Sequence, residues 1–351
     1  MIPNRWISLH IFYATDSTDL LTDGISPLVN ELRAAGLIER WFFISYWLEG
    51  PHLRLRLLPS LRDGADQQVR EIAMARLNDY LRRRPALWEP QTEGSEEVYK
   101  QLFLAEYTEE EWTRRYGKDG NMTFRPNNSV HEIAYEPEYD RYGGAAGIEV
   151  AESHFEHSSD AVVDLFKRTN AHVRTILLGQ AIQLATALAF SFLEDDESVG
   201  RFFLRYRLSW EQRYDRNSER FHEQFDESLN GVRDGLLERF AEIKAAVAGT
   251  DQPRDFRGPW IRHGLDLAAK LKELHGRSQL SFGEAMRDVP ALDQDVVLQI
   301  LLTSYIHMTN NRLGVQIQDE VYLSYLISKA LGTPQERAPA TEPTAETVAH
   351  A

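Results

Sequence analysis

Polar and apolar residues alternate most clearly in the second half of WFFISYWLEGPHLRLRLL, residues 41–58. The segment predicts two β-strands joined by a turn at residues 48–51. In the second strand His52, Arg54 and Arg56 occupy alternate positions, so their side chains project from one face of the sheet. The leucines between them cover the opposite face.

The rest of the N-terminal part predicts a mixture of strands and helices. Residues 6–14 are rich in β-forming types and predict a first strand, and residues 19–36 predict an amphipathic helix that ends at a glycine. Apolar residues at helical spacing predict a helix over residues 67–87. Residues 95–117 predict one or two acidic helices, and residues 129–135 predict an extended segment.

From residue 145 onward the hydrophobic spacing is almost wholly helical, and it predicts helices over residues 145–168, 171–195, 197–214, 217–248, 258–275, 292–311 and 317–331. The expected fold class is α+β, with a small mixed β-sheet and helices in the N-terminal half and mainly a helical bundle in the C-terminal half. We expect a single domain over residues 1–332, with an α/β part at 1–144 and a helical part at 145–332. Residues 333–351 are rich in Pro, Ala, Thr and Glu and predict a disordered tail.

Composition limits the class of protein. The apolar and charged fractions, 42% and 26%, are those of an ordinary globular protein. The net charge of −15 argues against direct nucleic-acid binding. The absence of cysteine excludes thiolate catalysis and zinc–thiolate sites. The most apolar segment, residues 176–193, contains Gln180 and Gln183, so we expect no membrane span. The N-terminus lacks the basic-then-apolar pattern of a secretion signal, so we expect a cytoplasmic protein.

Arg54 and Arg56 predict a bound anion. Two guanidiniums on alternate positions of one strand have Cα atoms about 7 Å apart, so they repel each other unless negative charge lies between them. The planar fork of arginine is well suited to the paired oxygens of a carboxylate.

A second candidate is Arg141, in the segment EPEYDRYGG at residues 136–144, where extended structure passes into the first long helix. A helix N-terminus favours anions, and the two glycines permit a tight turn and the close approach of a ligand. The alternative is an ion pair with Asp140 or Glu138 that holds the turn.

A third candidate is His307, which directly follows the apolar run at residues 296–306 and is therefore expected to be partly buried. A side chain that titrates near neutrality can give or take a proton. The alternative is a hydrogen-bonded core histidine. Arg312, five residues later, could interact with the C-terminus of the same helix.

Other motifs are weak. His154 and His157 stand three residues apart, but no His-Glu-x-x-His pattern is present, so we expect no metal site and no cofactor. The glycines at residues 143–147 lack the spacing and the following Lys-Ser/Thr of a phosphate-binding loop, and a Gly-x-Ser-x-Gly elbow is absent.

Three segments in this order, residues 41–56, 135–144 and 307–314, resemble the C-terminal domain of lantibiotic dehydratases. Stand-alone versions of that domain are described as thiopeptide-type bacteriocin biosynthesis proteins. The likeness spans residues 6–331, and its most specific parts are GPHLRLR and RYGG.

The resemblance implies a lyase that removes glutamate from glutamylated serine or threonine side chains of a ribosomally made precursor peptide, giving dehydroalanine or dehydrobutyrine. It implies catalytic roles for the residues that match the family's elimination arginines and histidine: Arg54, Arg56, Arg141 and His307. Further residues expected to bind substrate are His52, Tyr142, Asn311 and Arg312. The expected partners are a precursor peptide with its leader and a separate glutamylation protein that uses glutamyl-tRNA. The resemblance also suggests a homodimer.

The resemblance also leaves alternatives. Pyridine synthases of the same family join two dehydroalanines by a formal [4+2] cycloaddition, and they would be expected to dispense with the residues that grip glutamate. Because this chain retains all four, we favour elimination. A non-catalytic member that binds leader peptide is the third reading. For His307, removal of the α-proton and stabilisation of the enolate-like oxygen both remain open.

Overall fold

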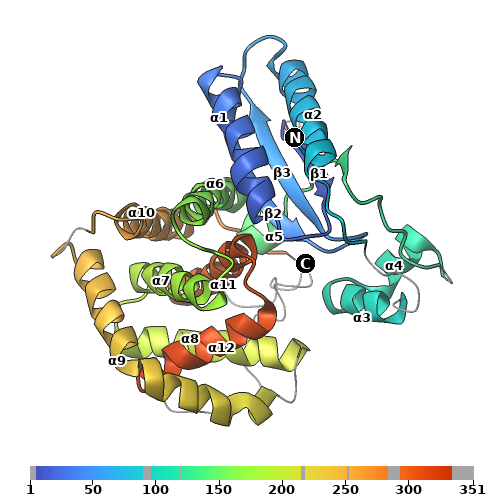
Figure 1. Ribbon diagram of the computed structural model, residues 1–351. Helices are drawn as coiled ribbons and strands as arrows, with labels where there is room; N and C mark the ends of the chain where they lie inside the picture. The colour runs from blue at the N-terminus through green and yellow to red at the C-terminus, as the bar shows by residue number, and fades with distance from the viewer. Residues whose placement is uncertain are drawn as a thin grey trace. The chain divides into compact units, whose positions relative to one another are not determined.

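The chain folds into two units. Unit 1 comprises Met1–Pro137 and Phe166–Arg168, and unit 2 comprises Glu138–Leu165 and Thr169–Ala351. The predicted tail lies, apart from Thr333, outside the described residues. The computed structural model (Figure 1) describes residues 5–89, 96–118, 120–214, 218–250, 253–283 and 293–333.

Unit 1 contains a four-stranded sheet in the order β2-β3-β1-β4. All three strand pairings are antiparallel, whereas the sequence predicted a mixed sheet. The short turn between β2 and β3 permits only an antiparallel pair, because a parallel pair needs a long crossover. The strands are β1 (Ile7–Phe12), β2 (Ile38–Tyr46), β3 (His52–Pro59) and β4 (Ser129–Glu132).

Helices α1 and α2 pack on the strands (Figure 1). Alternate residues such as Leu9, Phe43 and Leu55 are fully buried. Strand β1 is buried at every position, so both faces of the sheet are covered at this strand. The predicted helix at 19–36 begins as a π-helix, and the acidic region forms two helices with a small apolar core around Phe103 and Trp112. The helices of unit 1 are η1 (Leu20–Ile25), α1 (Ser26–Ala34), α2 (Ala65–Arg83), α3 (Glu96–Glu106) and α4 (Glu109–Tyr116).

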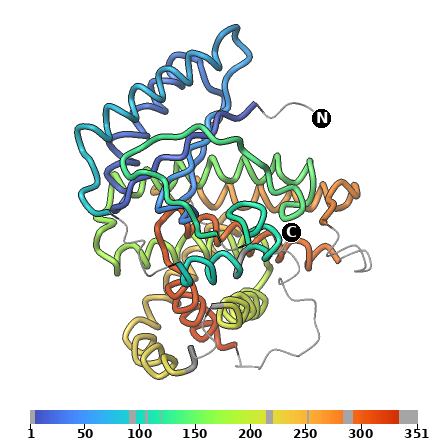
Figure 2. Tube along the Cα trace, turned by 90° about the vertical axis from the view of Figure 1, so that its right-hand side faces the viewer, coloured from blue at the N-terminus to red at the C-terminus, as the bar shows by residue number. Residues whose placement is uncertain are grey.

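Unit 2 is helical, so the predicted α+β class is confirmed. The predicted helices agree with the observed ones to within a few residues at each end. Helix α7 packs against α9, α10 and α11, and Figure 2 shows α12 packed against α8 and α9. The helices are α5 (Tyr139–Tyr142), α6 (Gly144–Arg168), α7 (Arg174–Phe192), α8 (Asp196–Tyr214), η2 (Ser218–Phe221), α9 (His222–Val247), α10 (Arg257–Gly276), α11 (Gln294–Leu313) and α12 (Ile317–Ala330).

Helix α7 is long and apolar enough to cross a membrane, and within the described ranges it alone meets that test. Of its most apolar 18-residue window, 61% is buried inside the protein. Because α7 packs against several other helices of unit 2, its apolar composition is that of a core helix surrounded by neighbours.

The glycine pair of the RYGG motif makes the turn from α5 into α6. Gly143 and Gly144 both have positive φ, 85° and 82°, which L side chains rarely adopt. A Cβ atom on Gly144 would lie 2.4 Å from Oγ of Ser281, and the Ser281 amide donates to the Gly143 carbonyl at 3.0 Å. The close approach that these glycines permit is therefore made by the loop at Ser281.

Candidate functional site

In unit 1 the basic residues of β3 lie on one sheet face, as the alternation predicted. The register places His10 of β1 opposite Arg54 of β3. We call His10, His52, Arg54 and Arg56 the sheet cluster.

Arg54 is held by two neighbours within the sheet. Its Nε donates to Nε2 of His52 at 3.2 Å, and its guanidinium carbon lies 3.5 Å from the centroid of the Tyr46 ring. Tyr46 belongs to β2 and pairs with His52 in the strand register. The guanidinium is thus stacked and oriented on the sheet face.

Arg56 is buried, with 4% of its surface exposed. Its Nη2 lies 3.5 Å from Nε2 of His10, and its guanidinium lies 5.2 Å from the Tyr135 ring. Among the residues that the structure describes, none accepts a hydrogen bond from its buried Nε and Nη1. Burial, and then the charge of Arg54, lower the pKa of Arg56 from 12.5 to about 9. Burying a cation with unsatisfied donors destabilises the fold unless an anion binds beside it and accepts their hydrogen bonds.

The two histidines of the sheet cluster add no positive charge at neutral pH. Burial is the largest cause that lowers the pKa of His52, to about 3, and the nearby arginines act in the same direction. The pKa of His10 is lowered further by the same causes. Their rings stack 4.9 Å apart. The charge of the sheet cluster therefore comes from Arg54 and Arg56.

In unit 2 the structure brings Arg141 and His307 to one face of α11. The Nε of Arg141 donates to Oγ of Ser304 at 3.3 Å, and Ser304 lies one turn before His307. Arg141 also pairs with Glu138 at 3.2 Å, so the ion pair proposed as the alternative is present. We call Arg141, Ser304, His307 and Glu320 the helix cluster.

His307 is held by a buried carboxylate. Its Nδ1 lies 2.8 Å from Oε1 of Glu320, a residue of α12 with 1% exposure. Glu320 also accepts hydrogen bonds from Nδ2 of Asn310, at 3.1 Å, and from the hydroxyl of Tyr206. Because a carboxylate only accepts, Nδ1 carries a proton and donates it. In the neutral ring Nε2 then holds the lone pair, and the side chain is 21% exposed.

The imidazole of His307 has a further contact, since its ring lies 4.8 Å from Trp210 of α8. The expectation that His307 is partly buried is confirmed. Its orientation is set by one hydrogen bond and one aromatic neighbour, an arrangement that fixes the tautomer of histidines that transfer protons.

Two residues predicted to bind substrate lie inside unit 2. Tyr142 is 2% exposed and packs against Phe155 and Tyr305. Arg312 is 1% exposed, donates to Oγ of Ser159 and to the carbonyl of Met308, and lies over Phe155. Both side chains are packed in the interior, so we leave them out of the proposed site. Asn311 is half-buried and lies one turn after His307.

The histidines considered for metal binding form a stack. His157 lies 4.2 Å from His263, and His263 lies 5.2 Å from His154, with the rings nearly parallel. Nδ1 of His154 and Nε2 of His263 are hydrogen-bonded at 3.0 Å. Over the described ranges no group of three or more His, Asp or Glu side chains is arranged to hold a metal ion.

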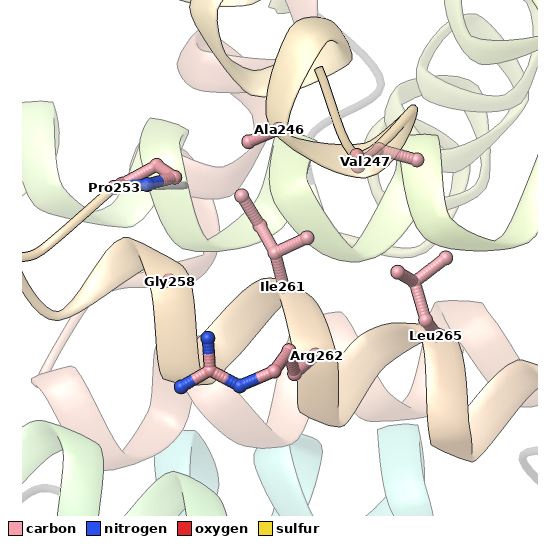
Figure 3. A pocket seen from close by; sticks show the side chains of 8 residues that line it. Ala246, Val247, Pro253, Gly258, Ile261, Arg262 and Leu265 are labelled. Atoms are coloured by element: carbon pink, nitrogen blue, oxygen red, sulfur yellow. The ribbon is translucent and has the colours of Figure 1, made fainter. Parts of the chain in front are cut away.

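A small pocket lies between the end of α9 and the start of α10 (Figure 3). Figure 3 shows Ile261 pointing toward Ala246 and Val247. The volume of the pocket is about 80 Å³, which is far below the range of about 300–1,000 Å³ typical of ligand sites. None of the predicted site residues lines it.

Sequence reasoning missed four residues of these clusters and their supports. Ser304 lies in the apolar run at residues 296–306, and its position one turn before His307 is the signal that could have identified it. His10 and Tyr46 are strand residues that only the strand register places beside Arg54. Glu320 resembles an ordinary acid in the first turn of a helix, where carboxylates are usually exposed.

Replacing Glu320 with glutamine is expected to lower the free energy of unfolding by about 1–3 kcal/mol, because the amide cannot accept all the hydrogen bonds that the carboxylate accepts. Thermal unfolding of the full chain measures the change. Glu223, in the first turn of α9, provides the control as Glu223→Gln, since its side chain is exposed. Equal stability of the two variants would contradict a buried, fully bonded Glu320.

Comparisons with known proteins agree with these motifs. The family model described as lantibiotic biosynthesis dehydratase C-term matches residues 6–331. A comparison with curated proteins finds no match. Three solved structures show that the fold is shared. The pyridine synthase TbtD from thiomuracin biosynthesis has a TM-score of 0.69 and 18% identity, over 93% of this chain and 98% of that one.

The second is TsrL, with a TM-score of 0.62 and 17% identity over 93% of each chain. The third is the tRNA-dependent lantibiotic dehydratase MibB from Microbispora sp. 107891, with a TM-score of 0.51 and 20% identity, over 94% of this chain and 28% of that one. Since the family model covers nearly the whole chain, this protein belongs to the lantibiotic biosynthesis dehydratase C-terminal family.

Proposed function

We propose that this protein removes glutamate from O-glutamyl serine or threonine in a ribosomally made precursor peptide. The reaction is a β-elimination that leaves dehydroalanine or dehydrobutyrine. Family membership supports the reaction class, because the family is that of the C-terminal part of lantibiotic dehydratases.

The observation that carries the proposal is Arg56. Its buried guanidinium has two donors that no described residue satisfies, next to a second guanidinium on the same face. The glutamyl group provides two anions for such a site. One is its free carboxylate, which is charged throughout the reaction, and the other is the ester carboxyl, which becomes a carboxylate when the Cβ–O bond breaks. Fixed positive charge therefore favours the transition state, in which the second charge develops.

The helix cluster supplies the proton transfer. We propose that Nε2 of His307 takes the α-proton of the glutamylated residue, while Nδ1 stays bonded to Glu320. The electron pair of the Cα–H bond forms the Cα=Cβ double bond, and the Cβ–O bond breaks to release glutamate as a carboxylate. Arg141, already held by Ser304 and Glu138, provides further positive charge for the departing group.

The proposal implies particular partners. The substrate is a precursor peptide with its leader, and a separate protein supplies the glutamyl group from glutamyl-tRNA. We place the reaction in the cytoplasm, where that donor is made.

A pyridine synthase is the second candidate. It is favoured by the similarity to TbtD, whose chain is covered over 98% of its length. Cycloaddition of two dehydroalanines expels no glutamate, so it gives no role to the unmet donors of Arg56. Elimination accounts for them and is the function that we propose.

One experiment separates the candidates. The protein is incubated with a synthetic peptide that carries O-glutamyl serine, and separately with a peptide that carries two dehydroalanines. Loss of glutamic acid from the first peptide, followed by mass spectrometry, is the expected result. Ring formation in the second peptide, without action on the first, would establish the pyridine synthase. Binding of both peptides without turnover would establish a non-catalytic member.

A further inference from the structure

His52 has hydrogen-bonding partners on both ring nitrogens. Its Nδ1 lies 2.8 Å from the carbonyl oxygen of Gly50, and its Nε2 lies 3.2 Å from Nε of Arg54. A carbonyl oxygen can only accept, so Nδ1 carries the proton. The Nε of arginine can only donate, so Nε2 holds the lone pair. The two partners together define one neutral tautomer.

The ring itself is held on several sides. His52 is 5% exposed, and its ring stacks on His10 at 4.9 Å and lies 4.5 Å from Phe12. The edge of Tyr46 contacts it at 5.9 Å. These neighbours come from β1 and β2, on either side of β3, so the imidazole has little freedom to turn.

We propose that His52 is a positioning residue, whose Nε2 accepts from Arg54 and thereby aims the guanidinium at the substrate anion. The inference rests on the proposed function for the identity of that anion. Arginine has five donors in a rigid fork. Engaging Nε in the bond to His52 fixes the plane of the guanidinium.

A positioning role also explains why His52 is neutral. A protonated ring would offer a second donor to Arg54 and would place a third positive charge beside the two arginines. Burial and the charges of Arg54, Arg56 and Arg125 keep the pKa of His52 low, at about 3. The sequence predicted that His52 binds substrate, but both of its nitrogens are bonded within unit 1.

Three substitutions of His52 in the full-length protein test the proposal. His52→Phe keeps the stacking and removes the acceptor, and it should lower kcat for O-glutamyl peptide about 10–100-fold, as expected for one hydrogen bond to a charged group. His52→Gln places an amide oxygen near the position of Nε2 and should restore most of the activity. His52→Asn can still donate to Gly50 but does not reach Arg54, so it should behave as His52→Phe.

A double mutant tests whether His52 acts through Arg54. In an Arg54→Lys background the Nε donor is gone, so adding His52→Phe should cause less than a twofold further loss. Full additivity of the two losses would overturn the proposal. His131→Phe is the matched control, because His131 lies on β4 of the same sheet and bonds to Ser129, and its kcat should be unchanged.

A spectroscopic measurement tests the bond without any reaction. The ¹⁵N spectrum of histidine-labelled protein, with His52 assigned by its loss in His52→Phe, should show a neutral ring protonated at Nδ1. A ring protonated at Nε2 or at both nitrogens would overturn the proposal. This result stands even if the peptide assays reject glutamate elimination, so the two failures can be told apart.

Discussion

Replacing His307 with alanine is expected to lower the rate of glutamate elimination by about 10²–10⁴-fold, the usual contribution of a positioned acid–base group. The reason is that Nε2 of His307 is the one ring nitrogen not bonded to Glu320, and its loss removes the proposed acceptor of the α-proton. Glutamylated peptide should accumulate, while binding of the peptide is retained. Mass spectrometry of the peptide over time measures both species.

A deuterium label at the α-carbon of the O-glutamyl serine makes this test specific. Wild-type protein should show slower elimination with the label when proton removal limits the rate, and His307→Ala should show no exchange of the label with water. His157→Ala is the control, because His157 is an exposed histidine of the same unit whose Nδ1 donates to the carbonyl of Ser153. Elimination by His307→Ala at the wild-type rate would contradict the proposed role.

Local sequence rules predicted the parts of the site that depend on one element. The period of two along β3 places His52, Arg54 and Arg56 on one face, whatever the neighbouring strands are. The short segment before the RYGG glycines likewise brings Glu138 within one helical turn of Arg141. Periodicity also gave the helices of unit 2, because each has a long apolar stripe.

Contacts between elements could not be predicted in this way. Glu320 stands 13 residues after His307 and beyond the helix end at Gly314, so no helical spacing links the two. Glu320 also accepts a hydrogen bond from Tyr206, which belongs to a third helix. The partners of Arg54 on β1 and β2 likewise follow from the strand register, which one strand does not encode.

Helix geometry explains why Tyr142 and Arg312 are buried although they adjoin Arg141 and His307 in the sequence. Arg312 is five residues after His307, about 140° around the helix, so it faces the core of unit 2 when His307 faces outward. Tyr142 is adjacent to Arg141 and points about 100° away from it. Neighbours in a motif can therefore have unrelated roles.

Replacing Arg56 with methionine is expected to raise the stability of the protein while it lowers elimination by about 10²–10³-fold, the cost of losing one donor to developing charge. Arginine keeps its proton over the working pH range. The lowered pKa of Arg56, about 9, therefore expresses the cost of a buried charge in the ligand-free fold. Below pH 9 this cost is fully present, so an apolar side chain of similar length should stabilise by about 1–4 kcal/mol.

Thermal unfolding at pH 7.5 and the peptide assay measure the two effects on the same samples, and free glutamate adds a third readout. Glutamate should raise the unfolding temperature of the wild type, because its carboxylate pairs with the guanidinium of Arg56 in the folded state. It should not raise the unfolding temperature of Arg56→Met. Arg62→Met is the matched control. The side chain of Arg62 is exposed and donates to the carbonyl of Ala35, so the variant should gain no stability and keep its activity.

A less stable Arg56→Met would mean that the charge is already compensated within the fold, and the unmet donors would no longer indicate a substrate anion. A gain in stability together with a loss of activity distinguishes an arginine that binds substrate from one that packs the core, since replacing a packing residue would lower stability and activity together.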